Sequence, residues 1–236
     1  MELSTKERLV LAIDTSDEQN AQRLSTVARE AGAKFVKFGL ELSSTTSWGY
    51  CSELAAKNNL DWIADAKLND IPNTTAQTVQ NISNLDYPPY GITIHTTSGK
   101  ESMQAAQDTS ENTTLFGVTI LSSISLAEAA RVYRVPMRQK VYELAKDAAS
   151  AGLKGVVVSP MEVGLIKRDP DTRDLLTLVP GIRSPEAVSY DQFRISTPVA
   201  ALNDGADLLV IGRQVTLARD PSTAFQTLVE EIQNSL

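Results

Sequence analysis

Apolar and polar positions alternate along the chain in blocks. An apolar run of strand length recurs eight times, and the stretches between these runs carry the three-to-four-residue apolar spacing of amphipathic helices. Strands are expected at residues 8–14, 34–42, 62–67, 91–97, 113–121, 155–160, 176–182 and 207–212. Helices are expected at residues 17–32, 48–58, 73–85, 100–107, 126–152, from 162 onward, 197–205 and 221–236. The helical region 126–152 should break or bend near Pro136.

This alternation favours an α/β fold with a parallel sheet. A closed (β/α)8 barrel needs ~250 residues, and the chain has 236 with neither a linker nor a low-complexity tract. An open doubly wound sheet is the alternative, but it usually has a glycine-rich turn after its first strand. Asp14, Thr15 and Ser16 occupy that place here. The sequence therefore predicts a single (β/α)8 TIM barrel over residues 1–236.

Composition and charge limit the classes of partner that the chain can bind. A net charge of -7 and a pI near 4.9 argue against a nucleic-acid binder, which would present a basic face. No apolar run approaches the ~20 residues of a membrane span. The single cysteine, Cys51, excludes an intrachain disulfide and fits a reducing compartment, so we expect a cytoplasmic protein. Cys51, Trp48 and Trp62 are interpreted as packing residues.

The third expected strand leads into a cluster of charge. Side chains two apart on a strand share a face, so Asp65 and Lys67 should emerge side by side, with Asp70 on the loop that follows. Such groups are costly to bury unless they pair or perform chemistry. A structural ion pair and a reaction centre both remain open at this point.

Other polar residues also fall at the expected carboxyl ends of the strands, where barrel enzymes form their active sites. They are Asp14, Lys37, Asp65, Lys67, His95, Ser122, Ser123, Ser159, Arg183 and Arg213. Structural ion pairs would have no reason to collect at one end of a barrel, so a functional role for Asp65 and Lys67 is favoured. For His95, packing within its layer is favoured over a role as general base.

The last two strand ends predict a phosphate site. Loops after the seventh and eighth strands of such barrels often bind phosphate through backbone amides. Gly181 and Gly212 would let the backbone approach an anion, and Arg183 and Arg213 could bind it in a bidentate manner.

The motif DAKLNDIPNT resembles the D-x-K-x-x-D-I-x-x-T signature of the orotidine 5'-phosphate decarboxylase family. The similarity extends to LAID, FVKFGLEL, LSS, VPGIR, DQFR and VIGR, in family order across nearly the whole chain. The resemblance implies decarboxylation of orotidine 5'-monophosphate to uridine 5'-monophosphate, the last step of de novo pyrimidine nucleotide synthesis, without a metal or other cofactor.

The resemblance also implies roles for individual residues. Lys67 would stabilise the carbanion at C6 and protonate it, Asp65 would lie against the substrate carboxylate, and Lys37 and Asp70 would complete the catalytic array. Asp70, Ile71 and Thr74 would reach the site of a second subunit in a homodimer. Asp14 and Lys37 would bind the ribose, Ser122 the pyrimidine, and Arg183, Gln192, Gly212 and Arg213 the phosphate. Ile71, Thr74 and Pro180 would also bind the substrate.

Two other functions remain as alternatives. The D-x-K-x-x-D core is shared with magnesium-dependent 3-keto-L-gulonate 6-phosphate decarboxylase and with hexulose phosphate synthase. Those relatives are expected to place an acidic metal ligand where this chain has Lys37, although Glu41 lies further along the same segment. The other alternative is a barrel that binds a phosphorylated metabolite without catalysis. Pure binding does not require a buried lysine between carboxylates, so the presence of Lys37, Asp65, Lys67 and Asp70 argues against it.

Overall fold

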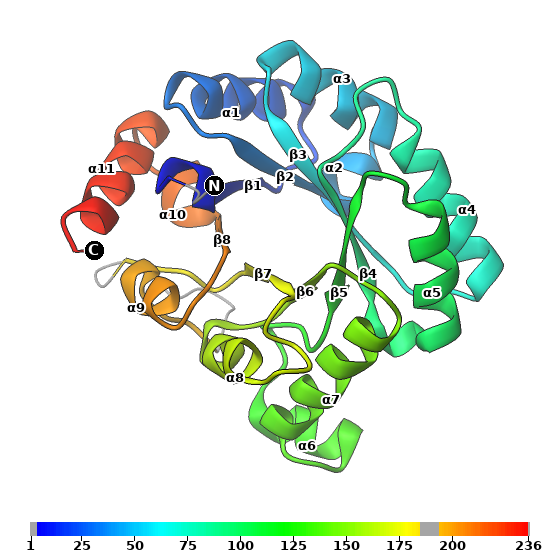
Figure 1. The fold of residues 1–236 in the computed structure, drawn as a ribbon. Coiled ribbons are helices and arrows are strands. Elements are labelled where there is room, and N and C mark those ends of the chain that lie inside the picture. Colours follow the sequence, from blue (N-terminus) through cyan, green and yellow to red (C-terminus); the bar gives the residue numbers. More distant parts are fainter. Residues whose placement is uncertain (1–3, 185–193, 236) are drawn as a thin grey trace.

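The chain folds into a closed barrel of eight parallel strands in the order β1 to β8 (Figure 1). The structure, a computed structural model, describes residues 4–184 and 194–235. The strands are β1 (Leu9–Ile13), β2 (Phe35–Gly39), β3 (Asp61–Leu68), β4 (Gly91–His95), β5 (Thr114–Val118), β6 (Gly155–Val157), β7 (Leu176–Val179) and β8 (Leu208–Ile211). β8 pairs with β1, which closes the sheet. The predicted (β/α)8 barrel is confirmed, and the open sheet is excluded.

Helices surround the barrel, as Figure 1 shows. They are α1 (Glu18–Glu30), α2 (Leu40–Ser43), α3 (Trp48–Asn58), α4 (Pro72–Ser83), α5 (Lys100–Thr109), α6 (Leu126–Tyr133), α7 (Met137–Ser150), α8 (Val163–Arg168), α9 (Pro198–Asn203), α10 (Arg213–Thr216) and α11 (Pro221–Gln233). Short 3-10 turns lie at Lys6–Arg8, Thr96–Ser98 and Pro160–Glu162. The expected break near Pro136 is confirmed, since α6 ends before this residue and α7 begins after it. None of the described helices is long and apolar enough to cross a membrane.

Aromatic side chains fill the amino-terminal half of the barrel interior. Phe35 and Tyr90 have ring centroids 4.9 Å apart, and Tyr90 lies 6.4 Å from Phe116. The Phe116 ring leaves no room for side chains on the adjacent strands, because a Cβ at Gly91 or Gly155 would lie 2.5 Å from it. Since Gly91 and Gly155 each begin a strand, this layer closes the amino-terminal end. The carboxyl-terminal half remains available for a site.

A second apolar layer packs between strands and helices. Trp62 is fully buried there, its ring centroid lies 6.5 Å from that of Trp48, and its Nε1 donates to the Tyr87 carbonyl at 3.0 Å. Cys51 is also buried, and burial raises the pKa of its thiol to about 12. The packing interpretation of these residues is confirmed.

Several strands end earlier than their apolar runs. β2 was expected to reach residue 42, but its pairing with β3 ends at Gly39, opposite Asp65. β5 and β6 likewise end before Ile120 and Val158, which are buried without belonging to their strands. An apolar run shows which residues are buried. The end of a strand is instead set by where its hydrogen bonding to the neighbouring strand stops. The single turn of α10 carries too few residues to show a period and was not predicted.

Candidate active site

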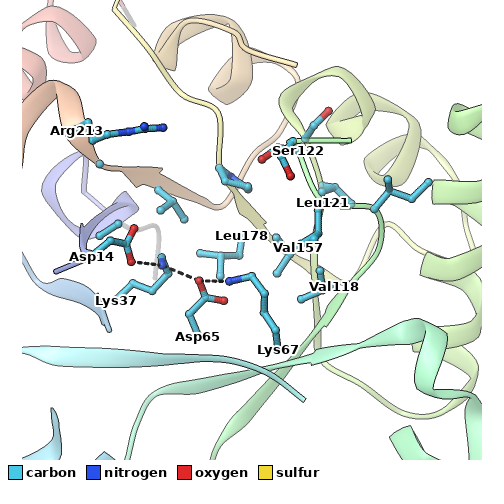
Figure 2. A pocket seen from close by; sticks show the side chains of 18 of the residues that line it. Asp14, Lys37, Asp65, Lys67, Val118, Leu121, Ser122, Val157, Leu178 and Arg213 are labelled. Atoms are coloured by element: carbon cyan, nitrogen blue, oxygen red, sulfur yellow. Dashed lines mark hydrogen bonds and ion pairs between the residues drawn. The ribbon is translucent and has the colours of Figure 1, made fainter. Parts of the chain in front are cut away.

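A cavity of about 530 Å³ opens at the carboxyl ends of the strands. Its lining includes ten residues that the sequence placed at strand ends: Asp14, Lys37, Asp65, Lys67, Ser122, Ser123, Ser159, Arg183, Gly212 and Arg213. Pro180 and Glu41 also line it. Figure 2 shows the charged residues of the first three strands in a row, with Arg213 on the side of Asp14 and Ser122 across the cavity.

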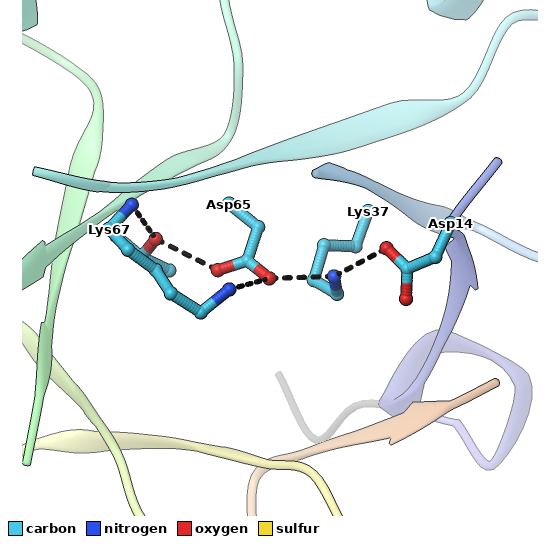
Figure 3. Close-up of polar contacts among 5 residues, drawn as sticks. Asp14, Lys37, Asp65 and Lys67 are labelled. Carbon is cyan, nitrogen blue, oxygen red and sulfur yellow. Dashed lines mark hydrogen bonds and ion pairs between the residues drawn. The ribbon is translucent and has the colours of Figure 1, made fainter. Parts of the chain in front are cut away.

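The row is an alternating array of carboxylates and ammoniums (Figure 3). Asp14 follows β1, and its Oδ1 lies 3.2 Å from Lys37 Nζ on β2. The same Nζ lies 2.7 Å from Asp65 Oδ2 on β3, and that oxygen is also 2.7 Å from Lys67 Nζ. Adjacent parallel strands therefore bring Asp14 and Lys37, which are far away in sequence, next to Asp65 and Lys67.

Burial and the neighbouring charges shift the pKa values of this array in opposite directions. The side chains of Lys37 and Asp65 are only 9% and 10% exposed, whereas Lys67 is 33% exposed. Burial acts to lower the pKa of Lys37, but the Asp65 and Asp14 carboxylates outweigh it and raise that pKa above its ordinary value. Burial acts to raise the pKa of Asp65, and Lys37 and Lys67 outweigh it and hold that pKa well below the usual range. Lys37 and Asp65 are thus both charged at neutral pH.

Lys67 reaches the cavity from an irregular backbone. Its φ is 45°, in the left-handed region, and the pairing of β3 with β4 shifts register between Ala64 and Leu68. A left-handed residue other than glycine or asparagine costs roughly 1–2 kcal/mol. Asp65 and Lys67 do lie side by side as predicted, but the regular two-residue alternation behind that prediction is interrupted by a bulge.

Thr93 on β4 holds this bulge, and sequence reasoning missed it. Its hydroxyl is fully buried, accepts a hydrogen bond from Lys67 N at 2.9 Å and donates one to Asp65 Oδ1 at 2.9 Å. The available signal was weak: a threonine in the apolar run GITIH, two residues before His95. His95 ends β4 and is half-buried, and burial together with the Lys67 ammonium lowers its pKa.

Three of the residues predicted for phosphate, Arg183, Gly212 and Arg213, line the cavity. Arg183 is 5% exposed, and Arg213 begins α10 directly after Gly212. Gly181 has a φ of 85°, and a Cβ there would lie 2.6 Å from the Arg194 carbonyl, so this close approach requires glycine. Gln192 lies outside the described residues.

A buried ion pair supports the same rim and was also missed. Arg194 Nη1 lies 3.0 Å from Glu162 Oε2, with side-chain exposures of 7% and 6%. The Ser159 hydroxyl donates to the same carboxylate oxygen. Arg194 Nη2 donates to the carbonyls of Ile120 and Leu121 at 2.9 and 3.0 Å. The pair therefore fixes the segment leading to Ser122, although Glu162 carries no motif that would reveal it.

Asp70, Ile71 and Thr74 are not part of this chain's own cavity lining. They are exposed at the turn from β3 into α4, where Asp70 Oδ1 accepts a hydrogen bond from Ile71 N at 2.7 Å. Ile71 is 66% exposed. Within a single chain these residues do not join the four-charge array.

Fold and site together define a (β/α)8-barrel enzyme with a lysine–aspartate array at the carboxyl end of its sheet. Residues 7–228 match the model of the family described as Orotidine 5'-phosphate decarboxylase / HUMPS. The chain belongs to this family and is a carboxy-lyase, which confirms the resemblance seen in its motifs.

Individual relatives match this chain over nearly its full length. The chain is 35% identical to the orotidine 5'-phosphate decarboxylase of Carboxydothermus hydrogenoformans, with 98% of each chain covered. It is 33% identical to that of Thermobifida fusca, with 96% of each covered. The crystal structure of orotidine 5'-phosphate decarboxylase from Lactobacillus acidophilus superimposes with a TM-score of 0.81 at 29% identity, covering 96% of this chain and 99% of the other.

Proposed function

We propose that this enzyme decarboxylates orotidine 5'-monophosphate to uridine 5'-monophosphate, the last step of de novo pyrimidine nucleotide synthesis, without a metal. The observation that carries the proposal is the Asp14–Lys37–Asp65–Lys67 array, with Lys67 Nζ 2.7 Å from Asp65 Oδ2 inside a cavity that Arg213 also lines. Relatives of the chain bear the name of this activity.

Lys67 has the chemistry that the step requires. When the bond from C6 to the carboxylate carbon breaks, carbon dioxide leaves and the electron pair stays on C6. A fixed ammonium stabilises that developing charge and then transfers its proton to C6, so Lys67 is both electrostatic stabiliser and general acid. Solvent then returns a proton to the neutral amine, which its 33% exposure permits.

Asp65 would lie against the substrate carboxylate. Two like charges ~4 Å apart repel by roughly 4 kcal/mol at an effective dielectric near 20, and this repulsion is released as carbon dioxide leaves. That energy is at most about half of the barrier reduction of a typical enzyme, about 8–23 kcal/mol. Preorganised stabilisation of the carbanion by the array is the larger contribution.

The remaining cavity residues would bind the rest of the nucleotide. Asp14 and Lys37 would bind the ribose hydroxyls, and Ser122, across the cavity, would bind the pyrimidine. The phosphate would be held by Arg183, Gln192, Gly212 and Arg213, and Pro180 would line the substrate cavity beside them. An acidic protein would thereby hold an anionic substrate through a locally basic rim.

A metal-free reaction is supported by the position of Lys37. Its ammonium lies between Asp14 and Asp65, so a cation that sought these carboxylates would meet a positive charge. The magnesium-dependent relatives are the competing assignment, and Glu41 at the cavity wall is the acidic residue they would use.

Absorbance tests both assignments. The purified protein with EDTA should deplete the ultraviolet absorbance of orotidine 5'-monophosphate, and Lys67→Ala should abolish this while remaining folded by circular dichroism. Unchanged absorbance with the wild type would reject the proposal. Activity that returns only with magnesium would favour the sugar-phosphate relatives.

We further propose a homodimer in which Asp70, Ile71 and Thr74 enter the partner's site. All three are exposed in the single chain, close in sequence to Lys67. The exposed Ile71 side chain supplies apolar surface that an interface would bury.

A further inference from the structure

Each oxygen of the Asp65 carboxylate has its own hydrogen-bond partners. Oδ2 accepts a hydrogen bond from each of the Lys37 and Lys67 ammoniums, both at 2.7 Å. Among the described residues, Oδ1 accepts a hydrogen bond only from the Thr93 hydroxyl, at 2.9 Å. A partial rotation about the Cβ–Cγ bond would move Oδ2 and change both lysine distances. Thr93 opposes this rotation from the other oxygen, Oδ1.

The direction of the Thr93 hydroxyl is fixed by Lys67. A threonine hydroxyl has a single proton to donate, and Lys67 N–H occupies a lone pair of the oxygen at 2.9 Å. The proton is therefore directed at Asp65 Oδ1. One buried side chain thus joins the left-handed backbone of Lys67 to the carboxylate that its ammonium contacts.

We infer that Thr93 is a positioning residue, which holds the Asp65 carboxylate and the Lys67 backbone in the relative orientation that proton transfer to C6 requires. The inference rests on the proposed function and deepens it. Thr93 contacts no substrate in this assignment, because it is not among the residues that line the cavity. Its loss should therefore lower kcat with little effect on KM.

The barrel supplies a matched control at its other end. Thr177 on β7 is also fully buried, its hydroxyl donates to Asp207 Oδ2 at 2.9 Å, and it accepts from Asp207 N at 3.0 Å. Lys167 Nζ lies 2.7 Å from the same carboxylate oxygen. Thr177, Asp207 and Lys167 are not among the residues that line the carboxyl-end cavity. Thr177→Val removes the same kind of hydrogen bond without touching the site.

The experiment compares steady-state decarboxylation of orotidine 5'-monophosphate by the wild type, Thr93→Val, Thr93→Ser and Thr177→Val, with thermal melting of each. Thr93→Val should lower kcat about 10- to 100-fold, because it removes a hydrogen bond to a charged group. KM should stay within about threefold, and Thr93→Ser should recover kcat to within about threefold of the wild type. Thr177→Val should lower the melting temperature and leave kcat unchanged.

Each other outcome overturns the assignment. If the wild type is active and Thr93→Val has the same kcat, the positioning role of Thr93 is rejected and the proposed function stands. The same conclusion follows if Thr93→Val and Thr177→Val lose kcat equally. An inactive wild type rejects the proposed function and the inference with it. If Thr93→Val does not fold, Thr93→Ser and Thr93→Ala form a second pair that differs by the hydroxyl alone. Equal kcat in that pair would contradict the inference.

Discussion

Asp65 ties the stability of the protein to pH. Its pKa is held well below the usual range by Lys37 and Lys67, so its carboxylate stabilises the folded state above its unfolded pKa of about 3.9. That stabilisation is lost as the pH falls from about 5 towards the lowered folded-state pKa, because the unfolded chain then binds a proton that the folded chain does not. The pKa of Lys37 is raised in the folded state, so its ammonium stabilises the fold fully at any pH below its unfolded pKa. This stabilisation is lost only in strong alkali.

Asp65→Asn should therefore flatten the acid side of the stability profile. Between about pH 4 and pH 2 the free energy of unfolding of the wild type should fall more steeply, by up to about 1.4 kcal/mol per pH unit. Urea denaturation at a series of pH values measures the two slopes. Parallel slopes would show that Asp65 is not the group whose pKa is lowered.

Arg213 should act through the phosphate of the substrate. Arg213→Ala removes a charge-assisted contact that we assign to this group, so kcat/KM for orotidine 5'-monophosphate should fall about 10- to 150-fold. The nucleoside without phosphate should react equally slowly with both enzymes. Arg219→Ala, which alters an exposed arginine outside the cavity lining, is the matched control and should change neither value. Equal losses for the two substrates would contradict the assignment.

The charged residues of the site were predictable and the residue that orients them was not. Lys37 and Asp65 each interrupt an apolar run, and burial of a charge demands an explanation that sequence alone can raise. Thr93 breaks no such rule, because threonine is common in strands. Its two hydrogen bonds arise from the bulge at Lys67, which depends on the pairing of β3 with β4 and has no local sequence signal.

At the scale of the elements, the number and order of strands followed from the apolar runs, but the contacts between loops did not. Ser196 N donates to the Gly181 carbonyl at 3.1 Å, and Arg183 N donates to the Ser196 carbonyl at 3.0 Å. These bonds bring together the two ends of the segment that follows β7. Both are long-range backbone contacts, which side-chain periodicity does not encode.

Glu162→Gln tests the buried ion pair between the β6 and β7 loops. It leaves the Arg194 guanidinium without its counter-charge at 7% exposure, and removing one partner of a buried pair costs about 3–5 kcal/mol. The midpoint of urea unfolding should fall accordingly. Glu128→Gln removes one partner of the exposed Arg131 pair and should leave the midpoint unchanged. Similar midpoints for the two variants would show that Arg194 is satisfied by the Ile120 and Leu121 carbonyls alone.

At the scale of the whole molecule, the proposed dimer divides each site between two chains. Lys67 acts within its own barrel, whereas Asp70 would act in the partner's, so two inactive variants should complement each other. In a mixed dimer of Lys67→Ala and Asp70→Ala, one site carries both defects and the other carries neither. Random exchange makes half of the dimers mixed, so about a quarter of the sites should be restored.

The measurement is decarboxylation after the two variants are unfolded together in urea and refolded. Each variant refolded alone is the control, and sedimentation confirms that the mixture is dimeric. Restoration requires that Asp70 crosses the interface, because a site built within one chain would keep a defect in every subunit. A dimeric mixture no more active than its separate components would place Asp70 in its own subunit's site and overturn the shared arrangement.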